Sequence, residues 1–294
     1  MTTAAQRSSA IASPARRSGG GLLGAIYIVW WRDVLRYWRD RARVGASLAQ
    51  PLLYLVIFGT GLASSLGGGF GASAGAAGIS YIQFIYPGVI SMSVLFTAIF
   101  GAMSIVWDRE FGFLREMLVA PVSRSSLVIG KCLGGATVAT FQGVIMLALA
   151  GFVHVPYSPG LLLVLVAEMA LVALTLTALG TLIASRMEQV EGFMAVMQFM
   201  VLPMFFLSGA VFPLSRLPHW LSWLTKVDPL SYAVDPMRRA IFDHVRAPAG
   251  VAHTLNPGMT WGGWRLPTSL ELGMIAFLGV TLLGFAVLQF SRPE

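Results

Sequence analysis

Six long runs of apolar residues, separated by shorter polar segments, dominate the chain. A helix that crosses the hydrocarbon core of a bilayer needs about 20 apolar residues, and each run is close to that length. Lipid forces a spanning segment to satisfy its own backbone hydrogen bonds, and the runs are about twice as long as a tilted membrane strand requires. The pattern therefore predicts six transmembrane helices, at residues 46–66, 82–106, 132–153, 161–185, 192–212 and 272–290.

The composition agrees with lipid as the surrounding solvent. Of the 294 residues, 56% are hydrophobic and 11% are charged, whereas soluble globular chains are about one quarter charged. The mean hydropathy is +0.74, and Glu168 is the one charged residue that interrupts an apolar run. We expect an all-α integral membrane protein, and the net charge of +7 is read as a matter of topology rather than as a sign of nucleic-acid binding.

The segment before the first run divides into two parts. Residues 1–21 are rich in Ser, Ala, Gly and Arg without apolar periodicity, which predicts a disordered basic cytoplasmic tail. Residues 22–44 repeat apolar side chains at helical spacing and place arginines on the opposite face. This pattern predicts an amphipathic interfacial helix ahead of a six-span domain at 45–294, with lipid anchoring and partner docking both open as its role. Its defining residues are Trp30, Arg32, Arg36, Trp38, Arg39 and Arg43.

The positive charges indicate the orientation in the membrane. With the N-terminus inside, the short outer loops 67–81 and 154–160 contain no Lys or Arg. Short loops report orientation because basic segments stay on the cytoplasmic side. We expect a multi-pass protein of the cell inner or plasma membrane with both termini in the cytoplasm. The inner segments, which hold 14 of the 20 Lys and Arg residues, are 1–45, 107–131, 186–191 and 291–294.

The segment between the fifth and sixth runs differs from the other loops. Residues 213–271 contain two apolar pieces, 220–224 and 232–242, and prolines interrupt the segment repeatedly. Each piece is too short to cross a bilayer. We expect short re-entrant or outer helices that pack over the outer mouth of the bundle.

The polar segment after the second run carries a recognisable pattern. Residues 107–124 read WDREFGFLREMLVAPVSR, and the segment closes at Gly130 and Lys131. This resembles the cytoplasmic signature of the permease subunits of type-2 export-family ABC transporters, particularly the branch of daunorubicin-resistance-type and nodulation-type exporters. Residues 228–235, which read DPLSYAVD and are followed by Arg238 and Arg239, are similar to the outer-segment pattern of that branch.

The resemblance implies a six-span permease that works as a dimer, with two ATP-binding cassette ATPase subunits beneath it. It also implies that the loop after the second span forms a coupling helix on the ATPase. The residues agree, because charges of both signs interleaved with large apolar groups suit a helix that buries one stripe against protein. Ala120 and Pro121 then end that helix. The expected coupling residues are Asp108, Arg109, Glu110, Phe111, Gly112, Phe113, Leu114, Arg115, Glu116 and Met117.

The chain contains no Gly-x-x-x-x-Gly-Lys-Ser/Thr phosphate loop, so we expect a transport subunit that is not itself an enzyme and has no nucleotide site of its own. ATP and Mg²⁺ would then be bound by the partner ATPase. An ion-coupled secondary transporter and a non-catalytic membrane scaffold are the alternatives. Ion coupling usually leaves several ionisable residues inside the membrane, and here only Glu168 lies within a run.

Four polar residues within or beside the runs either line an export path or bond neighbouring helices: Gln83, Gln142, Glu168 and Gln198. Gly130 and Gly134 form a Gly-x-x-x-Gly that permits close contact with another helix. The single cysteine and the four scattered histidines lack metal-ligand spacing, so no metal site is expected. The aromatic outer mouth suits either an amphipathic or lipid-like cargo or anchoring at the membrane interface. The resemblance adds drugs (as in multidrug resistance), lipids and glycans as classes of cargo. A homodimer is expected, with a heterodimer open, as are alternating access and a lateral path.

Overall fold

The computed structural model describes residues 22–62, 80–112, 123–214, 218–245 and 255–291. Within these residues, six apolar helical stretches are long enough to cross a membrane, which confirms the predicted number. Most of their bounds lie within about five residues of the ends of the apolar runs. The third span is the exception, because its helix begins at Arg124, whereas the run begins at residue 132. The spans are Val44–Gly61, Tyr81–Glu110, Arg124–Val153, Pro159–Ala184, Val190–Leu207 and Thr268–Ser291.

Several of these spans combine two helical elements. The first consists of α2 (Arg41–Val56) and a π-helical turn (Ile57–Leu62). The second consists of α5 (Tyr81–Gly101) and α6 (Met103–Glu110). The third is α8 (Arg124–Leu147) with a 3₁₀ extension (Ala148–Val153). The other three spans are α9 (Pro159–Ala184), α10 (Val190–Leu207) and α14 (Thr268–Ser291).

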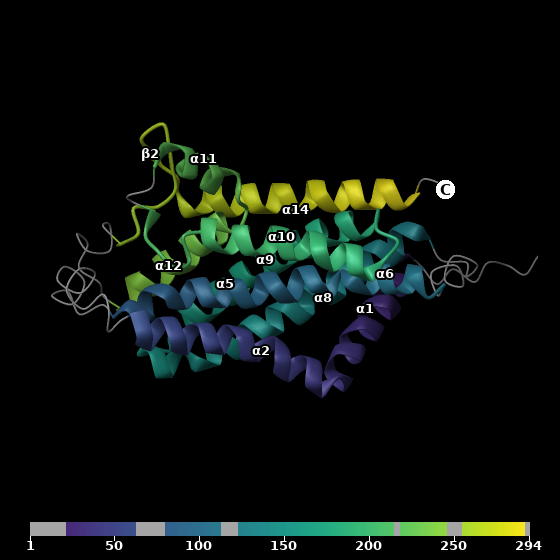
Figure 1. The fold of residues 1–294 in the computed structure, drawn as a ribbon, viewed down its shortest axis with the longest axis horizontal. Coiled ribbons are helices and arrows are strands. Elements are labelled where there is room, and N and C mark those ends of the chain that lie inside the picture. The colour runs from purple at the N-terminus through teal and green to yellow at the C-terminus, as the bar shows by residue number, and fades with distance from the viewer. Residues whose placement is uncertain (1–21, 63–79, 113–122, 215–217, 246–254, 292–294) are drawn as a thin grey trace, which may run out of the picture.

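The long helices lie side by side in one bundle (Figure 1). We call the end that carries α6 and the C-terminal end of α14 the loop end, which is on the right in Figure 1. The opposite end, which carries α12 and the strand β2, is the hairpin end. The span formed by α5 and α6 is the most enclosed, with 72% of its apolar stretch buried, compared with 17% for the first span. The second span therefore forms the centre of the bundle, and the first presents most of its surface outward.

A capping box fixes the start of α5. The Ser80 hydroxyl accepts a hydrogen bond from the amide of Gln83, and the Gln83 side chain accepts one from the amide of Ser80 at 3.0 Å. These two bonds satisfy amide groups that the first helical turn leaves without partners. Gln83 therefore has a structural role at the hairpin end, where its side-chain amide also donates to the carbonyl of His154 at 3.3 Å.

The predicted interfacial segment 22–44 contains two helices rather than one. The helix α1 (Leu22–Arg39) ends just before Asp40, where the chain turns into α2. α1 packs along α8, and the two glycines of the Gly-x-x-x-Gly face it: a Cβ atom at Gly130 would lie 2.8 Å from the Cβ of Val29. The partner of the glycine pair is therefore α1.

The segment before α14 contains the short helices that the sequence predicts. They are α11 (His219–Val227) and α12 (Ser231–Val245). A small antiparallel hairpin of β1 (Thr260–Trp261) and β2 (Trp264–Arg265), which the apolar pattern does not predict, follows them. Gly262 and Gly263 between the strands have φ of +58° and +85°. Two consecutive residues with positive φ are what the favoured two-residue hairpin turn requires, and glycine adopts them without strain.

Candidate functional site

The loop predicted to couple the chain to a partner begins at the last turn of α6. Asp108, Arg109 and Glu110 lie in that turn, and Gly112, with φ of +80°, ends the helix. Phe111 projects outward with 69% of its surface exposed. Four further predicted residues and Phe113 lie outside the described residues; these are Leu114, Arg115, Glu116 and Met117.

Asp108 joins the two sides of this loop. Its carboxylate accepts a hydrogen bond from the ammonium group of Lys131 on α8 at 2.6 Å, and both side chains are buried. The same ammonium group lies 4.0 Å from a carboxylate oxygen of Asp33 on α1, and the guanidinium of Arg32 lies 3.6 Å from Asp108. Removing one partner of a buried ion pair typically costs about 3–5 kcal/mol. The cluster therefore fastens α1, α6 and α8 together at the loop end.

Arg109 contacts the end of α9. Its guanidinium donates to the carbonyl oxygens of Ser185 at 2.9 Å and Met187 at 3.2 Å. The last carbonyls of a helix have no partner within the helix and carry the negative end of its dipole, so a cation is favoured there. Arg109 thus holds α6 against the end of α9.

Glu110 makes the complementary contact with the start of α10. A carboxylate oxygen of Glu110 accepts a hydrogen bond from the amide of Val190, the first residue of α10, at 2.9 Å. A carboxylate is favoured at this position because the first amides of a helix point outward and carry partial positive charge. Two consecutive residues of α6 therefore bind the C-terminal end of α9 and the N-terminal end of α10, which lie next to each other at the loop end.

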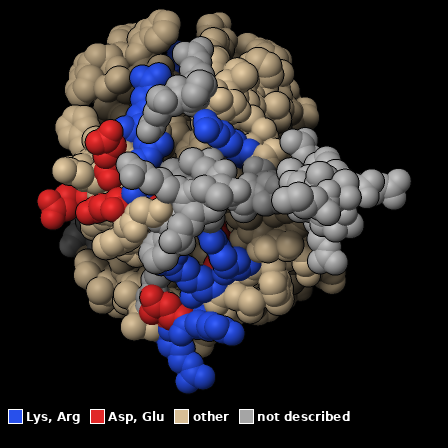
Figure 2. All heavy atoms as spheres, turned by 90° about the vertical axis from the view of Figure 1, so that its right-hand side faces the viewer, with Lys and Arg blue, Asp and Glu red and all other residues tan. Residues whose placement is uncertain are grey.

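Arg124 extends these contacts from the far side of the loop. At the start of α8, its guanidinium donates to the carbonyl of Phe290 near the end of α14 at 3.4 Å. Lys and Arg side chains gather on this face of the molecule, with acidic groups beside them (Figure 2). We call the five residues that join the helix ends here the loop-base network. They are Asp108, Arg109, Glu110, Arg124 and Lys131.

The residues that define the predicted interfacial helix contact protein on several sides. The indole of Trp30 donates to the hydroxyl of Thr137 on α8 at 2.9 Å. The ring of Trp38 lies 4.5 Å from that of Phe141. These contacts dock α1 on α8, while its roles in lipid anchoring and partner docking stay predictions. The other four defining residues are arginines. Arg32 joins the cluster around Asp108, and the guanidinium of Arg36 lies over the ring of Trp107. Arg39 is exposed, and the side chain of Arg43 lies outside the described part of the chain.

A cavity of about 360 Å³ lies beside this docked helix, between α1 and α2 on one side and α5, α6 and α8 on the other. Gln198 of α10 lines it. Gln142 lies behind Ser47 and Tyr37, two residues of the cavity wall whose hydroxyls hydrogen-bond to its side-chain oxygen at 3.2 and 2.7 Å. The two glutamines thus approach one cavity from different helices, and their role in a path stays a prediction.

Glu168 lies elsewhere in the bundle. It is 4% exposed on α9, and its Oε2 atom has no hydrogen-bond partner among the described residues. It is not among the residues that line the cavity. A buried carboxyl with an unused oxygen bears a desolvation cost, and its role stays a prediction.

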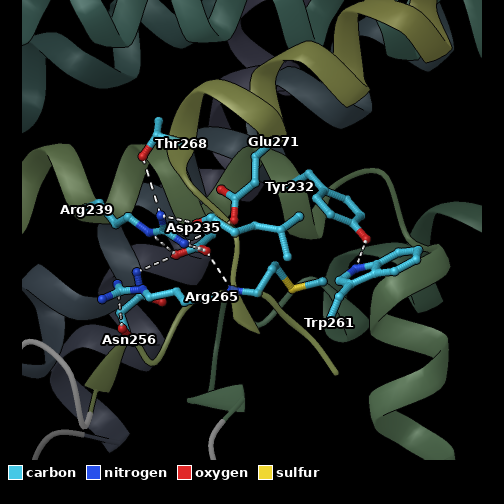
Figure 3. Close-up of polar contacts among 10 residues, drawn as sticks. Tyr232, Asp235, Arg239, Asn256, Trp261, Arg265, Thr268 and Glu271 are labelled. Carbon is cyan, nitrogen blue, oxygen red and sulfur yellow. Dashed lines mark hydrogen bonds and ion pairs between the residues drawn. The ribbon is translucent and has the colours of Figure 1, made fainter. Parts of the chain in front are cut away.

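A second ionic cluster, at the hairpin end, is not anticipated as a unit by the sequence (Figure 3). The guanidinium of Arg239 donates to Asp235 on the same helix and to Glu271 at the start of α14 at 3.0 Å. Asp235 also accepts hydrogen bonds from the side chain of Asn256 at 2.6 Å and the amide of Met259 at 2.9 Å. The cluster therefore joins α12, the segment before the hairpin and α14.

The electrostatics of Asp235 follow from these contacts. Burial raises the pKa of this carboxyl, but hydrogen bonds and charge from Arg239 outweigh burial and hold the pKa below its usual value. Asp235 is therefore ionised at neutral pH. Glu271 is fully buried, and its Oε2 atom has no partner among the described residues. It could not be singled out from the apolar pattern because it lies one residue before the sixth run.

Arg238, the neighbour of Arg239, is also buried, but it contacts α5 and the segment after α10 instead of the cluster around Asp235. Its guanidinium lies 4.1 Å above the ring of Phe84, and it donates to the carbonyls of Phe84 at 3.3 Å and Gly209 at 2.8 Å. Burial lowers its pKa to about 10, so the group remains charged at neutral pH. Arg238 thereby connects α12 with the start of α5 and the segment that follows α10.

Comparison with known proteins places this arrangement in a family. Residues 24–242 match the ABC-2 type transporter family. The putative transport permease ycf38 of Porphyra purpurea is 29% identical over 209 residues, which cover 70% of each chain. Nodulation protein J of Rhizobium leguminosarum bv. viciae is 28% identical over 223 residues, 73% of this chain and 82% of that protein.

A third relative matches over a shorter segment. The probable multidrug ABC transporter permease YbhR of Escherichia coli (strain K12) is 33% identical over 160 residues, 53% of this chain and 43% of that protein. The family match covers both the loop at 107–124 and the later segment at 228–239, which carry the resemblance. The chain is thus a multi-pass membrane protein that belongs to the ABC-2 type transporter family.

Proposed function

We propose that this chain is the membrane-spanning permease subunit of an ATP-binding cassette exporter, which moves an amphipathic or lipid-like molecule out of the cytoplasm. ATP and Mg²⁺ are bound by separate ATPase subunits. The family match and the relatives named as transport permeases support this function. The substrate classes of drug, lipid and glycan come from the family resemblance, and the cavity beside α1 gives a place for such a molecule to enter.

The loop end faces the cytoplasm in this proposal. The predicted inner segments hold 14 of the 20 Lys and Arg residues, and basic residues gather on the loop-end face in Figure 2. Basic segments stay on the cytoplasmic side during insertion. The C-terminal end of α14 lies at the same end (Figure 1), so the C-terminus is cytoplasmic too.

The loop-base network is the observation that carries the coupling mechanism. An ATPase that displaces the loop 111–123 pulls on α6, because α6 leads directly into it. Arg109 and Glu110 pass that displacement to α9 and α10, and Asp108 passes it to α8 and α1. Asp108 to Glu110 therefore transmit movement within the permease, while the exposed Phe111 and the residues after it contact the ATPase.

The permease works as a homodimer in this proposal. Two ATPase subunits close on ATP together, and each needs a loop to act on. The first, fifth and sixth spans are the least enclosed, with 17%, 28% and 22% of their apolar stretches buried. Their outward surfaces are therefore the ones open to contact with a second copy and with the surrounding lipid.

Reconstitution with the cognate ATPase tests the coupling role. We expect Arg109→Ala plus Glu110→Ala to reduce ATP-driven transport at least tenfold while basal ATP hydrolysis persists, because the loop remains but its connection to α9 and α10 is removed. Glu188→Ala, which removes an exposed carboxylate from the same α9–α10 junction, is the matched control and should transport normally. Normal transport by the double variant would refute the transmission role.

One observation favours the alternative of ion-coupled secondary transport. The structure buries a second carboxyl group, that of Glu271, in addition to that of Glu168. Intramembrane carboxyl groups serve as proton relays in such transporters. Transport by proteoliposomes that contain the chain without an ATPase, and its loss when the proton gradient is collapsed, would favour this alternative.

A further inference from the structure

One guanidinium serves two buried carboxyl groups at the hairpin end (Figure 3). The Nη2 atom of Arg239 donates to an oxygen of Asp235, and the same atom donates to Oε1 of Glu271 at 3.0 Å. The side chains of Asp235 and Glu271 are 4% and 0% exposed, so protein encloses both carboxyl groups. A single positive charge cannot balance two buried negative charges, and carboxyl groups that share a site do not both ionise readily.

Asp235 is the member of this pair that is ionised. Its oxygens accept hydrogen bonds from Nε and Nη2 of Arg239, from the side-chain amide of Asn256 at 2.6 Å and from the backbone amide of Met259 at 2.9 Å. A guanidinium and a backbone amide can only donate hydrogen bonds. A proton on Asp235 would displace one of these donors, so a proton held by the pair lies on Glu271.

Glu271 has a free position for that proton. Arg239 occupies its Oε1 atom, whereas no group of the described residues forms a hydrogen bond with Oε2. An ionised Glu271 would keep a buried oxygen without a hydrogen bond, which is costly. The side chain also lies within hydrogen-bonding reach of Asp235. Two carboxylates have no hydrogen to share, whereas a protonated Glu271 makes this bond and removes the cost.

The other groups that face Glu271 do not supply a second buried cation. Among the described residues, the further charge that acts on it is Arg265 of β2, which is exposed and donates to the carbonyl of Asn256 at 3.3 Å. Solvent screens an exposed charge, so Arg265 offsets little of a buried negative charge. The phenol of Tyr232 on α12 also faces Glu271 and is uncharged, with its hydroxyl donating to the carbonyl of Lys226 at 2.8 Å.

We propose that Glu271 is a proton-binding site, a carboxylic acid at neutral pH whose Oε2–H group donates to the carboxylate of Asp235. The ligand is a proton, and its release leaves two buried carboxylates against one guanidinium. The same pair holds the segment around the hairpin, because Asp235 binds the amide of Met259 and Arg239 binds the carbonyl of Leu266 at 2.9 Å. The bound proton therefore fastens the start of α14 to α12 and to the hairpin, and alkaline pH loosens this end.

Thermal unfolding of the full chain in lipid nanodiscs tests the site. Glu271→Gln keeps the shape of the side chain, and its amide donates to Asp235 but cannot ionise. In the wild type the folded chain holds a proton that an unfolded Glu271 has lost above about pH 5. We therefore expect the unfolding temperature of the variant, minus that of the wild type, to rise by about 2–4 °C per pH unit between about pH 5.5 and pH 7.5.

Asp243→Asn is the matched control, because Asp243 is an exposed carboxylate on the same helix as Asp235. Its difference from the wild type should stay constant over this range of pH. A difference for Glu271→Gln that is equally constant, or that levels off before neutral pH, would show that Glu271 is ionised in the folded protein and would overturn the proposal.

Infrared difference spectra distinguish a shared proton from a carboxyl group that is protonated only because it is buried. A protonated carboxylic acid has a carbonyl band separate from those of carboxylates and amides. We expect this band to be lost in Glu271→Gln at neutral pH. Asp235→Asn should lose the same band, because Arg239 then pairs with Glu271 alone and Glu271 ionises. Glu168→Gln, which alters the buried carboxyl group of α9, should retain it.

Two infrared results contradict the proposal. Wild type and Glu271→Gln with the same band would mean that Glu271 carries no proton. A band that persists in Asp235→Asn would mean that burial alone holds the proton and that the two carboxyl groups do not share it. The unfolding temperatures measured above show that each variant is folded.

The proton site does not depend on the proposed export function, which only places the hairpin end outside the cell and so makes the outer pH the one that acts on it. Both measurements are made without an ATPase or a substrate. A chain that passes both tests but shows no ATP-driven transport keeps the proton site and loses the export function. A chain that exports with its ATPase but gives a constant difference for Glu271→Gln loses the proton site alone.

Discussion

The ammonium group of Lys131 and the carboxylate of Asp108 lie 2.6 Å apart, and this pair closes the base of the loop between α6 and α8. The two residues are 23 positions apart in the chain; Asp108 lies in the last turn of α6, before the loop, and Lys131 lies about two turns into α8, after it. Any displacement of one side of the loop therefore acts on both helices.

Separating this pair should destabilise the protein strongly. Lys131→Met leaves the buried carboxylate of Asp108 without its nearest cation, so we expect a loss of about 3–5 kcal/mol of unfolding free energy. The double variant Lys131→Met plus Asp108→Asn removes both charges and should recover part of the loss. Cys132 is the single cysteine and is buried, so its reaction with a fluorogenic maleimide during heating reports unfolding. Equal unfolding temperatures for the two variants would contradict the pairing.

The contact between α1 and α8 depends on the absence of a side chain at Gly130. A Cβ atom there would lie 2.8 Å from the Cβ of Val29 and 3.0 Å from the carbonyl oxygen of Ile26. Gly130→Ala should therefore push α1 away and cost about 1–3 kcal/mol. Gly192→Ala on α10, where nothing lies within 4 Å, should be neutral or stabilising by up to about 1 kcal/mol. The two unfolding temperatures, measured side by side, check the prediction, and equal shifts would argue against the close contact.

The cluster at the hairpin end should depend on its arginine. Arg239→Ala leaves Asp235 and Glu271 buried without the guanidinium that they share (Figure 3), and we expect a loss of about 3–5 kcal/mol of stability. Asp243→Ala removes an exposed carboxylate from the same helix and should change stability by less than about 0.5 kcal/mol. Thermal unfolding of both variants distinguishes a cluster that holds α12 to α14 from an incidental contact.

Asp228 predicts a pH dependence of stability. Its carboxylate accepts hydrogen bonds from the amide of Leu230 and from the hydroxyl of Ser231, the first residue of α12. Burial nevertheless raises its pKa from 3.8 to about 7. Between these two values the folded protein holds more protons than the unfolded chain, so this group makes stability fall as pH rises from about 4 to about 7.

Asp228→Asn should remove that fall, because the amide does not ionise. We expect the unfolding temperature of the variant, relative to the wild type, to increase between pH 5 and about pH 7.5. The comparison uses the difference between the two proteins at each pH, so the other titrating groups cancel. A difference that stays constant or decreases with pH would show that burial does not raise the pKa of Asp228.

The spans could be predicted because lipid leaves little choice. A run such as 161–185 is apolar throughout except for Glu168, and only a helix satisfies its backbone in hydrocarbon. The observed helix, Pro159–Ala184, differs from that run by two residues at one end and one at the other. The short pieces at 220–224 and 232–242 were found within α11 and α12 for a related reason, since prolines and length exclude a full span.

The site could be predicted only as residue types in one loop. The signature located Asp108, Arg109 and Glu110, but their partners are helix ends that are distant in sequence, such as Val190 and Ser185. Periodicity gives no information on such contacts because they depend on how the spans pack. The same holds for Glu271, whose burial results from the approach of α12 and whose unpartnered oxygen is visible only in three dimensions.

The fifth span has a consequence of its own. At the loop end, Glu110 binds the amide of Val190, and at the hairpin end Arg238 binds the carbonyl of Gly209, just beyond the end of α10. A helix held by a hydrogen bond near each end tilts less freely, so bending is a motion that these contacts leave open to α10. Pro203 lacks an amide hydrogen, which makes it the position where bending costs least. Gln198 lies little more than one turn away, so a bend there would reshape the space in which a passenger molecule rests.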